Sequence, residues 1–521
     1  MKYKILVFIL FAIIQIGCEE TLDIEPESSL TFKNALNTPK DFESALNATD
    51  YAVKYMICNY TGEDPGNQVQ KGWYTDEVQQ GTYLEILQNN SPEYILNLNW
   101  KPFYDAIACA NVVLHHAEGS GISKERSNIY RGQAYFYKAL AYLELLHTWG
   151  DCILIRDEIE FLPTPKSEWT EVADYAIEQA QHAIDLLPEF EKVTDWQGNS
   201  PRFKSTPCKG AANALLAHLC AWKAGGKYFA KHQDYDEKEL WERAEKACSQ
   251  VIGSGTYELV PNAEAICTDA LVANSKESVY ETVFKDFWNE SSGFMNGAAD
   301  MLSIPGFFYH CYPLRAEFPA AFIKYIGVWI HNSTVREMYS GTDERKYAFF
   351  YQLDEMDKPE YGGYAFPNKW RLPMVETSGP NVGKTLNVNQ NKIWWRLADI
   401  YLLRAECRSR LGGEYTAGAI DDLNKVRERS KATLYNASEY GGDLRYTIFK
   451  EREKELIMEG QRYYDIIRNG YVRTELAGEF KTVTDQDLID GALFCMISKK
   501  AFSQNPLLRQ NTYWHNRKII N

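Results

Sequence analysis

The sequence predicts a mainly α-helical protein in which about four tetratricopeptide-like helix pairs pack against an irregular, loop-rich region. Three observations predict this fold. Apolar residues recur at helical spacing over most of the chain. Several of these segments come in pairs joined by a turn that contains glycine. The stretch 256–393 breaks the helical pattern and is rich in glycine, proline, asparagine and aromatic residues.

The spacing of apolar residues locates the expected helices along the chain. In order, they are Asp41–Met56, Trp100–His116, Glu125–Thr148, Trp169–Leu187, Cys208–Ala224, Glu239–Ile252, Trp395–Leu411, Tyr415–Ser430 and Tyr446–Arg468. The adjacent Trp394 and Trp395 fall at the start of one of these helices, where we expect them to pack in the core rather than to bind a ligand.

One helix pair shows the repeated pattern most clearly. Residues 401–411 and 415–423 are joined by Gly412 and Gly413, and the small residues Ala405 and Ala419 allow the two helices to approach closely. Looser copies are 141–150 with 173–187, and 214–226 with 241–252. A unit of this kind buries its apolar face only by stacking on its neighbours.

Composition excludes some classes of protein and favours others. The 521 residues are 45% hydrophobic and 24% charged, which is typical of a globular chain and excludes a disordered one. The net charge of −15 argues against a nucleic-acid partner, because the chain would repel phosphates. The 34 tyrosines and 13 tryptophans suit a half-exposed surface that stacks on flat, hydroxylated ligands.

The N-terminal segment has the pattern of a bacterial lipoprotein signal. Lys2 and Lys4 precede an apolar run, 5–14, that is too short to span a bilayer. Gly17-Cys18 follows and resembles a lipobox, which implies cleavage before Cys18 and acylation of that residue. An acidic tether comes next, and an uncleaved N-terminal anchor helix is the alternative.

The other ten cysteines form no CxxC pair and have no zinc-ligand spacing with histidine. Several lie on apolar helical faces, such as Cys109, Cys220 and Cys407, and we expect them to be small buried hydrophobic residues. No nucleotide-binding, zinc-protease or serine-hydrolase motif occurs, so the sequence predicts neither a cofactor nor a metal.

One helix carries carboxylates that could be read as catalytic. Glu451, Glu455 and Glu459 lie four residues apart, and a pair of carboxylates is what glycoside hydrolysis needs. Three cations are interleaved with them: Arg452, Lys454 and Arg462. Because nearby cations lower the pKa that a catalytic acid must have raised, we expect structural ion pairs and no catalytic residue here.

Several blocks of sequence, in order along nearly the whole chain, resemble the SusD/RagB family. They are 104–111 (YDAIACAN), 131–139 (RGQAYFYKA), 146–151 (LHTWGD), 396–406 (RLADIYLLRAE), 424–427 (NKVR), 451–468 (EREKELIMEGQRYYDIIR) and the tail around Asn505-Pro506 and Gln510-Asn511. The resemblance implies a non-enzymatic lipoprotein of the outer membrane that faces the cell exterior. It also implies that the protein binds oligosaccharide and caps a SusC-like TonB-dependent transporter, touching the membrane through its lipid anchor only.

The expected organisation follows from the signal, the pattern and the resemblance. We predict a signal peptide at 1–17, a lipidated acidic tether at 18–35, a helical N-terminal SusD-like part at 36–255, a loop-rich variable part at 256–393 and a helical C-terminal part at 394–521, all but the signal and tether in one globular unit.

Aromatic residues in the irregular stretches are the candidates for a sugar-binding platform, because an indole or phenol can cover the C–H face of a sugar ring. The candidates are Trp73, Tyr74, Trp288, Tyr312, Trp329 and Trp370. Polar candidates for bonding the hydroxyls are Asp76, Asn289 and Arg315.

Three other functions stay open on the sequence. The same import role could serve a non-sugar ligand such as a peptide. A surface glycoside hydrolase or peptidase would belong to a different class and would turn over its substrate. A scaffold that binds only its protein partner would show no affinity for a free ligand.

Overall fold

The structure is a computed structural model that describes residues 35–58, 79–80, 99–159, 162–283, 312–313, 328–358, 361–375, 377–380, 382–383, 385–388, 391–476 and 478–517. Cys18 and the residues before it therefore lie outside the described residues. No helix in the described part of the chain is both long enough and apolar enough to cross a membrane.

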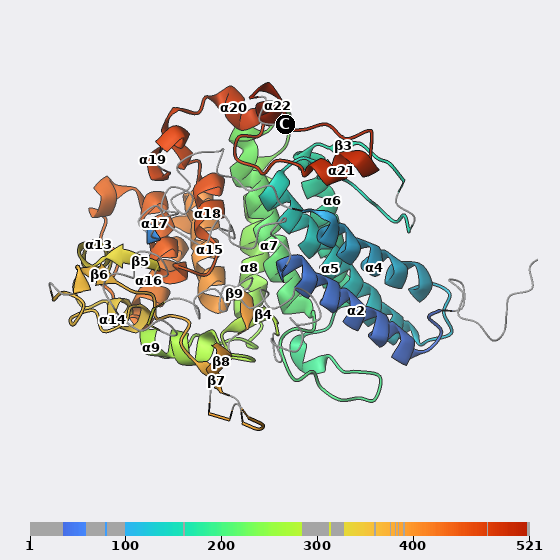
Figure 1. The fold of residues 1–521 in the computed structure, drawn as a ribbon, viewed down its shortest axis with the longest axis horizontal. Coiled ribbons are helices and arrows are strands. Elements are labelled where there is room, and N and C mark those ends of the chain that lie inside the picture. The colour runs from blue at the N-terminus through green and yellow to red at the C-terminus, as the bar shows by residue number, and fades with distance from the viewer. Residues whose placement is uncertain are drawn as a thin grey trace, which may run out of the picture.

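Long helices build the N-terminal half of the molecule (Figure 1). They are α2 (Pro39–Cys58), α4 (Lys101–Ala117), α5 (Lys124–Trp149), α6 (Trp169–Leu186), α7 (Lys209–Gly225) and α8 (Glu237–Gly253). Local caps start two of them. The Ser123 side chain accepts the N–H of Arg126 at the start of α5, and Asp236 accepts two N–H groups at the start of α8. These bounds lie within two residues of the predicted ones.

The C-terminal half repeats the pattern with shorter helices. They are α15 (Leu397–Leu411), α16 (Tyr415–Arg429), α17 (Leu444–Leu456), α18 (Arg462–Asn469), α19 (Val472–Glu475), α20 (Asp485–Ile489), α21 (Lys499–Gln504) and α22 (Thr512–Asn516). The pairs α5/α6, α7/α8 and α15/α16 pack as predicted, and α15 also packs on α8. In Figure 1, α7 and α8 stand between the N-terminal helices and the C-terminal ones.

Short strands and helices follow one another along the chain between α8 and α15, and strand β1 comes from the chain between α2 and α4. The strands are β1 (Gln79–Gln80), β4 (Ser278–Thr282), β5 (Val328–His331), β6 (Tyr364–Ala365), β7 (Pro373–Val375), β8 (Thr385–Val388) and β9 (Lys392–Arg396), with α13 (Asn332–Met338) and α14 (Arg345–Phe349) among them. They form small antiparallel sheets: β1-β5-β6, β4-β9 and β7-β8. A separate pair, β2 (Cys152–Ile153) with β3 (Lys166–Ser167), follows α5.

Two predicted boundaries are wrong. The helix predicted over Tyr446–Arg468 is interrupted between α17 and α18, where Met458 and Gly460 adopt φ of 65° and 93°. The buried ammonium of Lys369 donates to the carbonyl oxygens of Glu455 and Ile457, so side-chain bonds replace the missing helical ones. Trp395, predicted to begin a helix, instead lies in strand β9.

Trp394 and Trp395 are nevertheless core residues, as predicted, with exposed fractions of 5% and 3%. The cysteine prediction is confirmed for the eight cysteines whose side chains the structure describes. All eight are free thiols, and all except the half-buried Cys109 are fully buried.

The C-terminal tail docks on the N-terminal helices. The N–H of Cys495 donates to the carbonyl oxygen of Thr148 (2.8 Å), and the indole of Trp149 donates to that of Met496 (3.3 Å). Gly150 ends α5 with a φ of 66°, and a Cβ on it would come within 2.8 Å of the Phe494 ring. Residues almost 350 positions apart in sequence therefore complete one apolar core.

Candidate functional site

Most of the predicted platform residues lie outside the described residues. They are Trp73, Tyr74, Asp76, Trp288, Asn289 and Arg315. Tyr312, Trp329 and Trp370 are described, and the structure brings the first two together in one aromatic cluster.

This aromatic cluster consists of Trp329, Met356 and Phe366, which are buried, and of Tyr312, Tyr351, Tyr361 and Tyr364, which are half-buried against them. The three buried side chains form the floor of the cluster. The four phenols are its outer part, and they keep part of their surface open to solvent. An arrangement of this kind offers both apolar ring faces and hydroxyl groups to a ligand.

Strand pairing positions the first half of the cluster. Strand β5 pairs antiparallel with β6, with His331 opposite Tyr364 and Ile330 opposite Ala365. Because side chains alternate along a strand, Ile330 points into the core while Trp329 and His331 share the other face. The Trp329 and Tyr364 rings come to 5.1 Å between centroids, and the His331 ring lies 5.7 Å from that of Tyr364.

The segment after α14 positions the second half. The N–H of Tyr351 donates to the carbonyl oxygen of Phe366 (2.9 Å), which holds these two segments side by side. Tyr312 lies edge-on to Phe366 at 4.8 Å and to Tyr351 at 5.8 Å. Burial raises the pKa of Tyr312 above its ordinary value, so its hydroxyl stays protonated.

Trp329 also leaves a polar atom without a partner. Its indole is 6% exposed, and its Nε1–H is buried with no hydrogen-bond acceptor in the structure as described. A buried donor of this kind costs about 1–3 kcal/mol when nothing accepts from it. A ligand oxygen or a water molecule at this position would remove that cost.

Trp370 does not belong to the cluster, and this corrects its choice as a platform residue. Its ring is 3% exposed, packs in a neighbouring apolar core and donates its Nε1–H to the carbonyl oxygen of Met458 (3.2 Å). A ring that is enclosed and hydrogen-bonded in this way has no open face for a sugar.

Four aromatic members of the cluster are not among the platform residues that the sequence predicts. They are Tyr351, Tyr361, Tyr364 and Phe366. Their local sequence carries no distinctive signal, because the cluster forms only when β5 and β6 pair across more than 30 residues. The three tyrosines at 351, 361 and 364 do occur within a short, loop-like stretch, and that density was the available clue.

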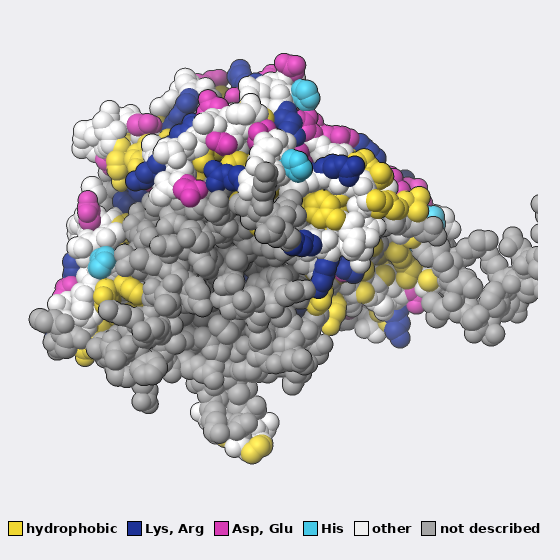
Figure 2. Space-filling model, turned by 45° about the horizontal axis from the view of Figure 1, so that its top comes forward, with side chains coloured by type: hydrophobic (Ala, Val, Ile, Leu, Met, Phe, Trp, Pro, Cys, Tyr) yellow, Lys and Arg dark blue, Asp and Glu magenta, His cyan; other side chains and the backbone are white. Residues whose placement is uncertain are grey.

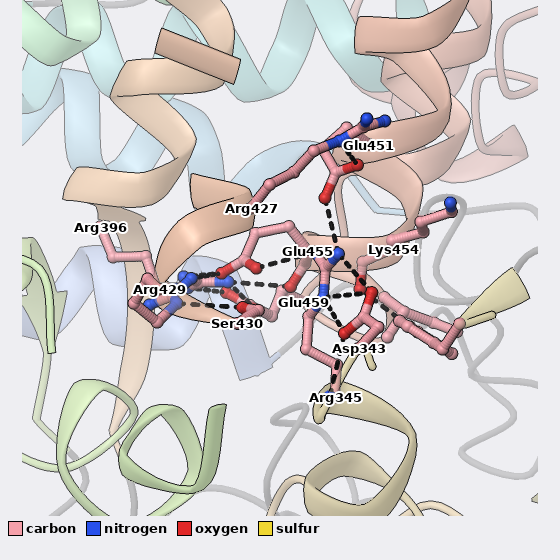
Figure 3. Close-up of polar contacts among 12 residues, drawn as sticks. Asp343, Arg345, Arg396, Arg427, Arg429, Ser430, Glu451, Lys454, Glu455 and Glu459 are labelled. Atoms are coloured by element: carbon pink, nitrogen blue, oxygen red, sulfur yellow. Dashed lines mark hydrogen bonds and ion pairs between the residues drawn. The ribbon is translucent and has the colours of Figure 1, made fainter. Parts of the chain in front are cut away.

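A buried network of charges connects the start of α14 with the carboxylates of α17 (Figure 3). The guanidinium of Arg345, at the start of α14, donates to Asp343, to Glu451 (2.6 Å) and to Glu455 (3.1 Å). Arg345 is fully buried. These contacts join α14, which leads directly into Tyr351, to α17 of the helical C-terminal part.

Arg396 extends the network to the sheet. It donates to Glu277 (2.8 Å), Glu455 (2.6 Å) and both carboxylate oxygens of Glu459 (2.8 and 2.9 Å). Arg429 of α16 is paired with Glu455 and Glu277 in addition. At least two cations therefore hold each of the four glutamates of the network, Glu277, Glu451, Glu455 and Glu459.

The network explains why these carboxylates are unsuited to acid catalysis. Burial alone would raise their pKa values, but the surrounding cations more than offset it, so that the pKa of Glu451 falls to about 2 and those of Glu455 and Glu459 lie below their ordinary value. A general acid needs a raised pKa. The geometry thus agrees with the prediction of structural ion pairs.

Among the residues that the structure describes, no three His, Cys, Asp or Glu side chains come together as a metal-binding group.

Comparisons with known proteins match both halves of the chain. A family model described as "SusD family" matches residues 320–514, and one described as "Starch-binding associating with outer membrane" matches residues 20–220. The chain belongs to the SusD/RagB family. All members of the aromatic cluster except Tyr312 lie within the first of these ranges.

Individual relatives align over most of their length at low identity. SusD-like protein P38 of Formosa agariphila is 23% identical over 98% of this chain and 99% of its own. A SusD-like protein of Bacteroides ovatus is 25% identical over 90% of this chain and 82% of its own.

Solved structures show the same fold. A SusD homolog from Bacteroides thetaiotaomicron superposes with a TM-score of 0.72 at 20% identity and covers 92% of this chain and 99% of its own. A SusD-like carbohydrate binding protein from Bacteroides vulgatus has a TM-score of 0.60 at 19% identity, with 83% of this chain and 84% of its own covered. The SusD-like fold that the sequence predicts is therefore confirmed.

Proposed function

We propose that this SusD/RagB family protein binds oligosaccharide at the cell surface and delivers it to a SusC-like TonB-dependent transporter. The aromatic cluster around Trp329 is the observation that carries the proposal. Four half-buried tyrosines share one apolar floor, and the indole N–H of Trp329 has no partner in the described structure. Ring faces cover the C–H face of a sugar, and phenol hydroxyls bond its hydroxyl groups.

The printed descriptions of relatives support the class of ligand. The model that matches residues 20–220 is described as starch-binding and associated with the outer membrane. The neighbour from Bacteroides vulgatus is described as carbohydrate binding. Cys18 would anchor the protein by its lipid, and the acidic residues that follow it would form the tether.

The surface agrees with a neutral ligand better than with a nucleic acid. Figure 2 shows acidic and basic side chains interspersed over the described part of one face, without a continuous basic patch there. With a net charge of −15, the chain as a whole repels polyanions.

In this proposal the protein binds its ligand without catalysis, and Glu455 and Glu459 have a structural role only, because guanidiniums and Lys369 hold them ionised in the core. A glycoside hydrolase remains the alternative from a different class, and it predicts release of product from a bound glycan. An import role for a peptide would use the same fold, and a ligand screen separates it from the glycan.

The test is calorimetric titration of the chain from residue 19 onward with a panel of soluble plant, host and microbial glycans and with peptides, with product analysis on the same samples. We expect saturable heat with one class of glycan and no product. Tyr364→Ala and Tyr351→Ala should each weaken binding about tenfold, because loss of about 50 Å² of apolar contact at about 25 cal/mol per Å² amounts to about 1.3 kcal/mol.

Tyr347→Ala is the matched control, since Tyr347 lies on α14 close in sequence to the cluster but is 52% exposed and outside it. Unchanged affinity in both cluster variants, in folded protein, would contradict the site. If only peptides bind, the imported ligand is a peptide and not a glycan. If product is released from a bound glycan, the protein is a glycoside hydrolase.

A further inference from the structure

A cavity of about 380 Å³ lies between α2, α5 and the segment 193–206, and none of its lining residues belongs to the aromatic cluster. Its polar lining comes from all three elements: Glu43 and Asp50 from α2, Gln133 from α5, and Asp195, Asn199 and Arg202 from the segment. This volume is within the range of small-molecule sites.

Hydrogen bonds fix the walls of this cavity. Arg126 of α5 donates to the carbonyl oxygen of Thr194 (2.6 Å) and to its hydroxyl (3.0 Å), which ties the segment to the helix. The carboxylate of Asp195 accepts the N–H groups of Gln197 (2.9 Å) and Asn199 (2.8 Å) and so shapes the turn between them. The cavity is thus formed before any ligand arrives, which lowers the entropy lost on binding.

Gln133 is the feature that points to a ligand. Its side chain lines the cavity and is only 8% exposed, yet its carboxamide has no hydrogen-bond partner among the described residues. A glutamine that faces a cavity and makes no bond within the described protein leaves one acceptor and two donors for whatever fills that cavity. A ligand that offers both donors and acceptors in the cavity would satisfy it.

The lining also restricts the chemistry of that ligand. Three carboxylates, those of Glu43, Asp50 and Asp195, and one guanidinium, that of Arg202, line the cavity, and Glu43 accepts the hydroxyl of Tyr130 (2.9 Å). Carboxylates accept hydrogen bonds from hydroxyl or ammonium groups and repel anions. Trp196 follows the lining residue Asp195 and does not itself line the cavity; its side chain is 46% exposed, and its backbone N–H donates to the carboxylate of the lining residue Glu43.

We propose that this cavity is a second carbohydrate site, which takes one sugar unit that carries no acidic group. The inference rests on the proposed function, since it assumes that the protein handles glycans. It adds a site of different character: the aromatic cluster offers ring faces, whereas this cavity is lined mainly by polar groups around a single sugar. The probes that test it are glucose, glucosamine and glucuronate.

The experiment uses the chain from residue 19 onward with ¹⁵N-labelled tryptophan, and follows the indole signal of Trp196, assigned with Trp196→Phe. Glucose and glucosamine should shift this signal in a saturable way, and glucuronate at equal concentration should not. Gln133→Leu should weaken the binding at least tenfold without lowering the melting temperature, because the glutamine amide has no partner to lose in the protein.

Gln179→Leu is the matched control. Gln179 of α6 is 4% exposed and its side-chain oxygen lacks a partner in the structure as described, but it does not line the cavity. Sugar binding should therefore be unchanged in this variant.

Three results would overturn the proposal: no shift of the Trp196 signal with any of the sugars, an equal shift with glucuronate, or wild-type binding by Gln133→Leu. The two functional claims separate in the same experiments. A glycan that binds in calorimetry and is weakened by Tyr364→Ala, while the Trp196 signal stays in place, overturns the second site alone. Failure of every saccharide in both assays overturns the second site and the proposed function together.

Discussion

Replacing Glu451 by glutamine tests the buried network most directly. Glu451 is 1% exposed, and its two carboxylate oxygens accept from Arg345 (2.6 Å) and from Arg427 (2.8 Å). Glutamine keeps the shape of the side chain but removes the charge, and only one of its terminal atoms can accept a hydrogen bond. Two buried guanidiniums would then share one neutral acceptor.

The expected loss follows from the pKa of this carboxyl. Burial would raise it, but Arg345 and Arg427 more than offset burial and lower it from 4.5 to about 2. That difference corresponds to about 3 kcal/mol of stability at pH 7, which agrees with the cost of removing one partner of a buried ion pair. A lowered pKa in the folded state stabilises the protein above the unfolded-state value, and this contribution disappears as the pH falls from about 4.5 to about 2.

The assay is thermal and urea denaturation of the wild type and Glu451→Gln between pH 7 and pH 2. The variant should be about 3 kcal/mol less stable at pH 7, and the difference should shrink steadily below pH 4.5. Glu428→Gln is the control, because Glu428 lies exposed on the nearby α16 and forms no ion pair among the described residues. Equal stability of the two variants at pH 7, or a difference that does not depend on pH, would refute the reasoning.

Two further predictions concern packing and thiol chemistry. Gly150→Ala should lower the melting temperature more than Gly412→Ala in calorimetry: both glycines have φ near 66°, but only at Gly150 would a Cβ meet a side chain, that of Phe494. Equal losses of melting temperature in the two variants would mean that Phe494 moves away from the added Cβ without destabilising the protein. Of the eight cysteines described, Cys109 should be alkylated first in the native protein, and Cys152, whose burial raises its pKa to about 12, should be protected until unfolding. Mass spectrometry of partly labelled protein checks the order, and early labelling of Cys152 would contradict it.

The sequence predicted the long helices well, because each has an apolar face whose period can be read locally. For α5 and α7 the bounds agree within two residues. The errors occur where distant contacts decide the backbone. The break after Leu456 depends on Lys369, a residue almost 90 positions away, which bonds the carbonyl oxygens that the helix leaves unpaired.

The same reason limits what could be predicted of the site. Tyr312 and Trp329 are among the predicted platform residues, and the structure places both in one cluster with Phe366. Trp370 has the same local appearance, but it is enclosed by the core and bonded to Met458. Sequence shows that a loop is rich in aromatic residues, and only the fold shows which rings keep an open face.

The docked tail has a consequence for how the protein is made. Asn505 donates to the carbonyl oxygen of Thr164 (2.7 Å), and the N–H of Cys495 donates to that of Thr148, so the end of α5 and the segment after it receive partners from residues more than 340 positions later in the chain. A chain that has emerged only as far as α18 lacks the Phe494 ring against Gly150 and the acceptor for Trp149. The N-terminal helices therefore cannot complete their packing until residues 494–505 have also been made, which delays this part of the fold.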